Sequence, residues 1–177
     1  ILHLAQPVTF DANTKLAELA SDPANTYVGS NAFFFGWWKS CSGTLDNAMQ
    51  LYSEPVISTD QANQLFVGSV PPIHIGDDQL AVFDLAGIFA FENSAQGAGI
   101  YGFDGSGQIR LIGIQGVGNS FSPFGCSDPS LPSVGARVTS YKPWISSYAG
   151  AGQTSLSAYG TGTPGCAGAS LLTGFPL

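Results

Sequence analysis

Side chains that commonly carry acid-base or metal chemistry are few in this chain, which has two histidines. His3 alternates with apolar neighbours, a pattern typical of a strand residue at the surface or held by a hydrogen bond. His74 follows a Pro-Pro pair and precedes Asp77 and Asp78, where a solvated turn is favoured over a metal site. The histidines therefore indicate no metal site, and no cofactor is expected.

The chemistry of the three cysteines is limited by their spacing. Cys41, Cys126 and Cys166 form no Cys-x-x-Cys pair, which argues against a zinc site. An odd number leaves at least one thiol free, or paired with a segment outside this chain. The composition is rich in Gly, Ser and Thr and poor in charge, which indicates an extracellular or periplasmic location, where disulfides persist.

Length and charge exclude several classes of function. The 177 residues suit one domain plus an appendage. Five basic against twelve acidic residues give a net charge of −7, so neither nucleic acid nor an anionic membrane surface is expected as a partner. No apolar run is long enough to span a membrane. Since the chain has no signal peptide and does not begin with Met, we expect a processed or excised piece of a longer protein.

Local patterns favour a largely β structure. A content of 23 glycines with only 10% charged residues fits many short strands joined by turns. Aromatic and β-branched runs predict strands over 1–10, over 27–38 as one long strand, and over 49–53, just before Pro55. The sequence Asp-Gly-Ser-Gly at 104–107, between two apolar runs, predicts a β-hairpin.

Two helices are predicted. Ser58 is followed three residues later by Gln61, the spacing of a capping box, so a short helix is expected through Leu65. A second helix is expected near 142–149, because apolar residues recur there with helical spacing and Pro143 suits a first helical position.

The order of several short motifs resembles the C-terminal half of trypsin-like serine proteases. The matching family segments are a crossover "LLKLxxPV", a "GW" pair, a core strand "LVGI", a "GC" loop, a strand "PGVYxRV" and a helix opening "YxxWI". They correspond in this chain to residues 1–8, 36–37, 109–114, 125–126, 132–138 and 140–145. The resemblance implies that residues 1–149 form an all-β domain, an antiparallel six-stranded Greek-key barrel of the trypsin second-domain type with a C-terminal helix. Residues 150–177, which carry no charge, are expected to be a Gly/Ser/Thr-rich linker and the start of a further strand or module, with a floppy tail as the alternative.

The same resemblance places the family's nucleophile at Ser94. The family's "GDSGGP" corresponds to residues 92–97, in which Glu92 and Asn93 replace the first glycine and the aspartate. A glutamate adds bulk and negative charge where backbone amides should face an oxyanion. Neither histidine lies where the family keeps its base, and the family's first barrel, which supplies the catalytic histidine and aspartate, is absent. We therefore expect Ser94 to be a loop serine at a relic site.

Substrate-binding positions have changed as well. The family's "SWG" strand corresponds to Gly116-Val117-Gly118, and the base of the primary specificity pocket falls near Ile88. The family's partner for Cys126 is also missing, so the resemblance implies a replacement disulfide between Cys41 and Cys126. Such a bridge would close a gap of about 84 residues and contribute about 4 kcal/mol in the chain-entropy model.

Three functions remain open at this stage. The first is a secreted, non-catalytic protease homologue, a binding or structural module whose partner is an N-terminal protease-like barrel or a second copy of the chain. The second is the C-terminal half of an active serine endopeptidase, in which Ser94 attacks, amides of 92–94 form the oxyanion hole, and a separate N-terminal chain supplies histidine and aspartate. The third is a subunit of an extracellular assembly or filament, with strand 1–10 or 169–177 added to a neighbour's sheet.

Overall fold

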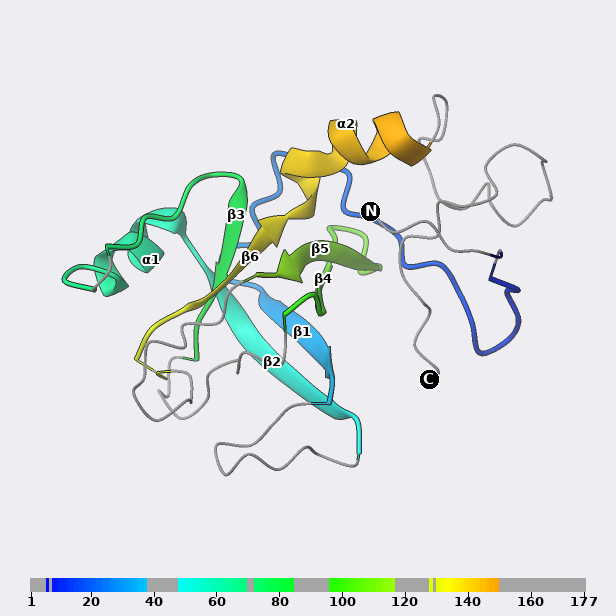
Figure 1. Cartoon of the computed structure of the whole chain (residues 1–177), viewed down its shortest axis with the longest axis horizontal. Helices are drawn as coiled ribbons and strands as arrows, with labels where there is room; N and C mark the ends of the chain where they lie inside the picture. The colour runs from blue at the N-terminus through cyan, green and yellow to red at the C-terminus, as the bar shows by residue number, and fades with distance from the viewer. Residues whose placement is uncertain are drawn as a thin grey trace.

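A computed structural model of the chain contains an antiparallel β-barrel with two helices at its surface (Figure 1). The residues that the structure describes are 6, 8–37, 48–69, 72–84, 96–116, 128 and 130–149. Their strands are β1 (Asn31–Gly36), β2 (Gln50–Ile57), β3 (Gln79–Val82), β4 (Gly99–Phe103), β5 (Ile109–Gln115) and β6 (Ser133–Arg137). They close in the order β1-β2-β3-β6-β5-β4. The six-stranded antiparallel barrel with a C-terminal helix predicted from the sequence is therefore confirmed.

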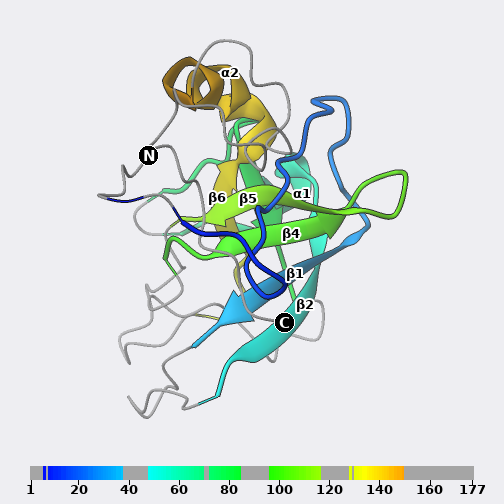
Figure 2. The same ribbon diagram turned by 90° about the vertical axis from the view of Figure 1, so that its right-hand side faces the viewer.

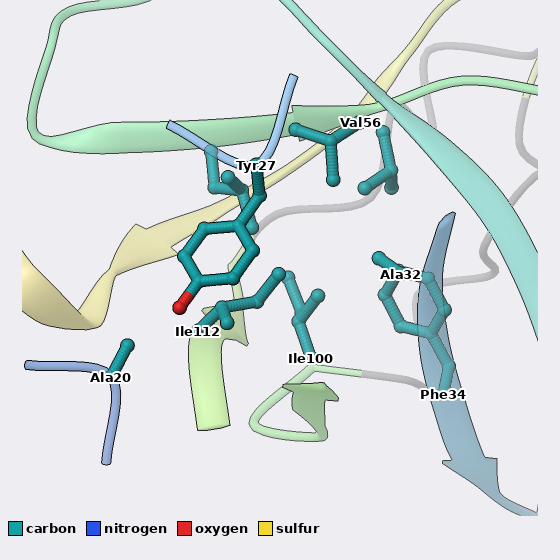
Figure 3. Close-up of a cluster of buried hydrophobic side chains, with 9 residues drawn as sticks. Ala20, Tyr27, Ala32, Phe34, Val56, Ile100 and Ile112 are labelled. Carbon is teal, nitrogen blue, oxygen red and sulfur yellow. The ribbon is translucent and has the colours of Figure 1, made fainter. Parts of the chain in front are cut away.

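Alternate residues along the strands fill the barrel interior, as the pleat of a β-strand requires. Figure 3 shows part of this cluster, in which the side chains of Phe34, Val56 and Ile100 point toward one another. Its buried members are Ala20, Tyr27, Ala32, Phe34, Val56, Leu80, Val82, Ile100 and Ile112. Burying these apolar surfaces closes the sheet, because the side chains come from β1 to β5 and from the segment before β1.

The predicted hairpin is confirmed, and its turn is held by Asp104. The Asp104 carboxylate accepts hydrogen bonds from the backbone amides of Ser106 and Gln108, at 2.9 and 3.0 Å. It also accepts one from Nε of Arg110 at 2.7 Å. The pKa of Asp104 is lowered, chiefly because the Ser106 hydroxyl donates to its carboxylate at 2.6 Å, and the backbone amides of Gln108 and Ser106 add to the effect by favouring the charged form. The turn thereby fixes the register of β4 against β5.

The long strand predicted over 27–38 is shorter in the structure, where β1 begins at Asn31. Tyr27 has a φ of 60°, and the Ser30 amide donates to the Tyr27 carbonyl at 3.0 Å. This turn aims the Tyr27 ring into the barrel interior (Figure 3), where the ring is 5% exposed. The aromatic residue that suggested a strand thus enters the core from a turn. Residues 8–10, also predicted as strand, form none.

Both helices are present, with one boundary different from the prediction. In α1 (Thr59–Leu65) the predicted capping box is formed, with reciprocal hydrogen bonds between Ser58 and Gln61. The second helix, α2 (Val138–Ala149), begins four residues earlier than predicted, so Pro143 lies inside it. Val138 is buried against Tyr101 and Leu111, and this packing starts the helix directly at the end of β6. None of the helices in the described part of the chain is long and apolar enough to cross a membrane.

The segment before β1 crosses the outside of the barrel at β5 (Figure 2). Leu19 forms a parallel bridge with Leu111, supported by hydrogen bonds from Ala20 N to Leu111 O and from Leu111 N to Glu18 O. Glu18 also forms an ion pair with Arg110. This segment therefore covers part of the outer face of β5 and anchors the described chain before β1 to the barrel.

Candidate functional site

The site predicted from the sequence is described by the structure only at its edges. Of the predicted site residues, Gly116 is described. The others lie outside the described residues: Cys41, Ile88, Glu92, Asn93, Ser94, Val117, Gly118 and Cys126. The predicted disulfide and the assignment of Ser94 as a relic therefore stay predictions, and the surroundings are built from the flanking residues.

The flanking residues join the end of β5 to the start of β4. The Gly97 amide donates to the Gln115 carbonyl at 2.8 Å, and the Gln115 amide donates to the Ala98 carbonyl at 2.8 Å. The Gly116 amide in turn donates to the carbonyl of Val134, in β6, at 3.1 Å. The residues that follow Ser94 in the sequence are thus hydrogen-bonded to the strand that leads into the predicted substrate-binding segment.

The resemblance found in the sequence places the last residue of the family's motif "GDSGGP", a proline, at Gly97. Gly97 has a φ of 85°, whereas a proline ring holds φ near about −65°. A proline would also lack the amide hydrogen that Gly97 gives to Gln115. The turn at residues 96–97 therefore enters β4 along a path that the family's proline cannot follow.

The same end of the barrel holds two buried polar side chains that the sequence analysis missed. Glu54 in β2 is 5% exposed and Gln115 in β5 is 2% exposed. Glu54 lies two residues from both Tyr52 and Val56 on β2, so all three share one face of the strand. Val56 belongs to the interior cluster and Tyr52 packs against it, so Glu54 points inward as well. A Cβ atom at Gly113 would lie 3.1 Å from Ile100 Cδ1, so Gln115, two residues further along β5, shares that inward face.

Burial changes the acidity of Glu54. Loss of solvation raises the pKa of the Glu54 carboxyl to about 8, and the negative charge of Asp84 adds to the shift. The predicted strand over 49–53 stopped before Pro55, so Glu54 was not considered. In the structure β2 runs through Pro55, whose carbonyl accepts from the Phe83 amide at 3.1 Å. The signal that could have identified Glu54 is its two-residue spacing from Tyr52 and Val56, which places it on the same face of the strand as these two large apolar side chains.

His74 is exposed, in the chain between α1 and β3. The described residues contain no group of three or more His, Cys, Asp or Glu side chains that could hold a metal ion. His74 lies outside any helix or strand, and a turn follows it at residues 77–78. Its exposure and this turn favour the interpretation of His74 as a solvated loop residue.

A pocket of about 490 Å³ lies between the starts of α1 and α2. Its lining includes Ser58, Asp60 and Thr139, with Arg137 at one wall. The Arg137 guanidinium donates to the carbonyl of Gln79 at 3.0 Å and to that of Thr26 at 3.3 Å. Arg137 therefore holds three parts of the chain together, and Gly116, the described residue of the predicted site, does not line the pocket.

Comparison with known proteins gives the chain's relatives, although no protein-family model matches it. It is 34% identical over 147 residues to fibrinolytic enzyme isozyme C of the earthworm Lumbricus rubellus, covering 82% of this chain and 59% of the relative. It is 27% identical over 147 residues to the serine proteinase stubble of Drosophila melanogaster, covering 82% and 18%. It is 26% identical over 149 residues to trypsin-2 of Salmo salar, covering 83% and 57%. The chain thus spans less than two thirds of the length of each of these relatives.

Proposed function

Because this chain belongs to the trypsin-like serine protease family, we propose that it is a secreted, non-catalytic member that uses the barrel as a binding module. The observation that carries the proposal is the segment around Ser94 and its exit into β4. Glu92 and Asn93 replace family residues on one side of the serine, and Gly97 replaces the family's proline with a φ of 85° on the other. Because the segment is altered on both sides of Ser94, we expect this serine not to carry out acyl transfer.

The expected loss of chemistry is large. A serine hydroxyl needs a base to take its proton, and loss of a triad base typically costs about six orders of magnitude in turnover. Neither His3 nor His74 corresponds to the family's base. Removing one donor of an oxyanion hole costs about 3–4 kcal/mol. Since both deficits act on one transition state they do not add, but either one brings turnover close to background.

The outer face of the barrel supports a protein partner. Figure 2 shows β5, β4, β1 and β2 side by side on this face. Its exposed apolar residues are Trp37 (48%), Leu51 (59%), Phe103 (46%) and Ile109 (53%). Phe33 and Phe35 lie between them, in ring contact with Phe103 and Tyr101. Contiguous apolar patches of this kind mark interaction surfaces.

We assign this face to an N-terminal protease-like barrel, because the relatives are longer than this chain and its motifs resemble those of the family's C-terminal half. Of the aromatic residues predicted for such a face, Phe33, Phe35 and Trp37 lie on it. Phe34 instead fills the barrel interior at 0% exposure, and Trp38 lies outside the described residues.

Hydrolysis assays test the proposal. The purified chain and the full-length product of its gene are incubated with casein and with an ester substrate, beside trypsin as a positive control. The proposal predicts no turnover above that of Ser94→Ala with either preparation. Turnover by the full-length product that is lost in Ser94→Ala would refute the non-catalytic assignment.

The second candidate, the C-terminal half of an active serine endopeptidase, is favoured by one observation. The relative of 34% identity is named as a fibrinolytic enzyme, and the position of the family's nucleophile is still a serine. This candidate predicts that the isolated chain is inactive and that an N-terminal half containing histidine and aspartate restores turnover. Titrating the chain with that half distinguishes it from the first proposal, which predicts binding without turnover.

A further inference from the structure

Glu54 and Gln115 are the two side chains of the described barrel that bury polar atoms without a hydrogen-bond partner. Among the described residues, Oε1 of Glu54 and both amide atoms of Gln115 have none. Buried polar groups are nearly always paired in folded proteins, because leaving one unpaired forfeits its solvation without compensation. Two such groups inside one narrow barrel therefore call for a common explanation.

The strand registers place these two residues opposite each other. From Gln115 the pairing leads one way through Gly135 to Leu80; extending the β2–β3 register by one residue puts Leu80 level with Ser58, just past the end of β2. The other way it leads through Ala98 and Gly36 to Gln50 in β2. Because the strands of a barrel are tilted, following the paired residues around the barrel in the two directions arrives at two different residues, Ser58 and Gln50. The residue directly across the barrel from Gln115 lies midway between these two. That residue of β2 is Glu54.

The interior is narrow enough for the two side chains to meet. A barrel of about eight strands is just filled by its own side chains, and one of six is narrower. Beside the pair the lining is small, since Ala98 packs against the interior cluster and Gly135 leaves no room for a Cβ atom, which would lie 2.7 Å from Ile100 Cδ1. Two long, inward side chains at one level can therefore reach each other by a change of rotamer, since no hydrogen bond joins their orphaned atoms in the structure.

We propose that Glu54 and Gln115 form a proton-dependent hydrogen-bonded pair across the barrel interior, which makes the stability of this barrel fall as the pH rises. The protonated carboxyl of Glu54 donates its hydrogen to Oε1 of Gln115, and Nε2 of Gln115 donates to the carbonyl oxygen of the acid. A neutral carboxylic acid and a primary amide offer complementary donors and acceptors, so all the orphaned atoms are satisfied at once. When Glu54 ionises it loses its donor, and Oε1 of Gln115 is left without a partner.

The charges around Glu54 favour the protonated form. The residues near it on the other strands are uncharged: Ala32 and Phe34 on β1, Ala98 just before β4, Gln115 on β5 and Ser133 on β6. The titratable groups are Tyr52 on β2 itself and Asp84, which follows β3 in the chain. The Asp84 carboxylate repels an ionised Glu54, which adds to the effect of burial in raising the pKa of Glu54.

The direction of the pH effect follows from linkage. The pKa of Glu54 is about 8 in the folded protein, against 4.5 for an unperturbed glutamate. The folded state therefore holds the proton more tightly than the unfolded chain does. The contribution of Glu54 to the free energy of unfolding is therefore greatest below pH 4.5. It falls as the pH rises and is constant above about pH 8. Between these limits the unfolding equilibrium constant rises by up to about tenfold per pH unit. This property is independent of whether the chain hydrolyses peptides.

Carbon-13 NMR of the glutamate carboxyls tests the titration directly. The chain has three glutamates, Glu18, Glu54 and Glu92, so selective labelling gives three signals that single Glu→Gln variants assign. We expect the signal lost in Glu54→Gln to titrate near pH 8 in the full chain, well above the 4.5 of an unperturbed glutamate. A Glu54 signal that titrates near pH 4.5 would overturn the proposal.

Urea unfolding between pH 5 and 9.5 tests the consequence and the pairing. Glu54→Gln is expected to remove most of the fall in stability with pH, whereas Asp60→Asn, an exposed carboxyl in α1, is expected to leave it. In a double-mutant cycle at pH 6, Gln115→Leu should raise the unfolding constant by at least about threefold more in the wild type than in Glu54→Leu. Equal effects of Gln115→Leu in the two backgrounds would contradict the pair, even if Glu54 titrates as expected.

Discussion

Replacing Gly97 by proline tests the local backbone at the position where the resemblance places the proline of the family's motif. Gly97 has a φ of 85°, and its amide donates to the Gln115 carbonyl at 2.8 Å. Gly97→Pro removes that hydrogen bond, a loss of about 0.5–1.5 kcal/mol. It also forces φ to the opposite sign, and backbone strain at such positions costs about 1–3 kcal/mol. We therefore expect the free energy of unfolding to fall by about 2–4 kcal/mol.

Gly97→Ala separates the two contributions. A Cβ atom at Gly97 would meet nothing within 4 Å, so alanine tests the positive φ alone while it keeps the amide hydrogen. Its expected cost is about 1–2 kcal/mol. Urea unfolding followed by tryptophan fluorescence measures both variants, and with a slope of about 2 kcal/mol per molar the proline midpoint should fall by about 1–2 M.

The opposite result has a clear meaning. If residue 97 followed the family's backbone, proline would fit and would stabilise the chain by about 0.4–1 kcal/mol, because it restricts the unfolded state. A Gly97→Pro variant as stable as the wild type would therefore refute the description of this turn. It would also remove the structural support for a non-catalytic site.

Two further predictions concern packing and cross-linking. Gly135→Ala places a Cβ atom 2.5 Å from the Ile114 carbonyl oxygen, so we expect it to lower the free energy of unfolding by about 1–3 kcal/mol, while Gly105→Ala, with open space around it, changes little. Equal urea midpoints for the two alanine variants would contradict the close contact of β5 and β6. Peptide mapping under non-reducing conditions is expected to link Cys41 to Cys126; a Cys126–Cys166 peptide would show that the predicted pairing is wrong.

The features predicted correctly were those fixed by local chemistry. The Ser58–Gln61 capping box and the Asp104 turn need only neighbouring residues, so their sequence signals were sufficient. The start of α2 was misplaced because buried packing of Val138, a tertiary contact, outweighed the preference of Pro143 for a first turn.

The parts of the site that were missed depend on contacts distant in sequence. Tyr27 reads as a strand residue, but its ring fills the core from a turn that only the closed barrel can stabilise. Glu54 becomes a functional candidate only when β2 continues through Pro55 and the barrel closes over the carboxyl. No pattern in the sequence reports that Gln115 stands opposite it, since this relation follows from the registers of all six strands.

The most direct test of the non-catalytic assignment is covalent labelling with a fluorophosphonate probe, followed by mass spectrometry of the peptide that contains Ser94. The full-length product of the gene is used, with Ser94→Ala as the control and trypsin as the reference. Our account predicts no modification of Ser94 under conditions that label trypsin completely, because the serine lacks both an activating base and an intact oxyanion loop. Stoichiometric modification at Ser94 that disappears in Ser94→Ala would contradict it.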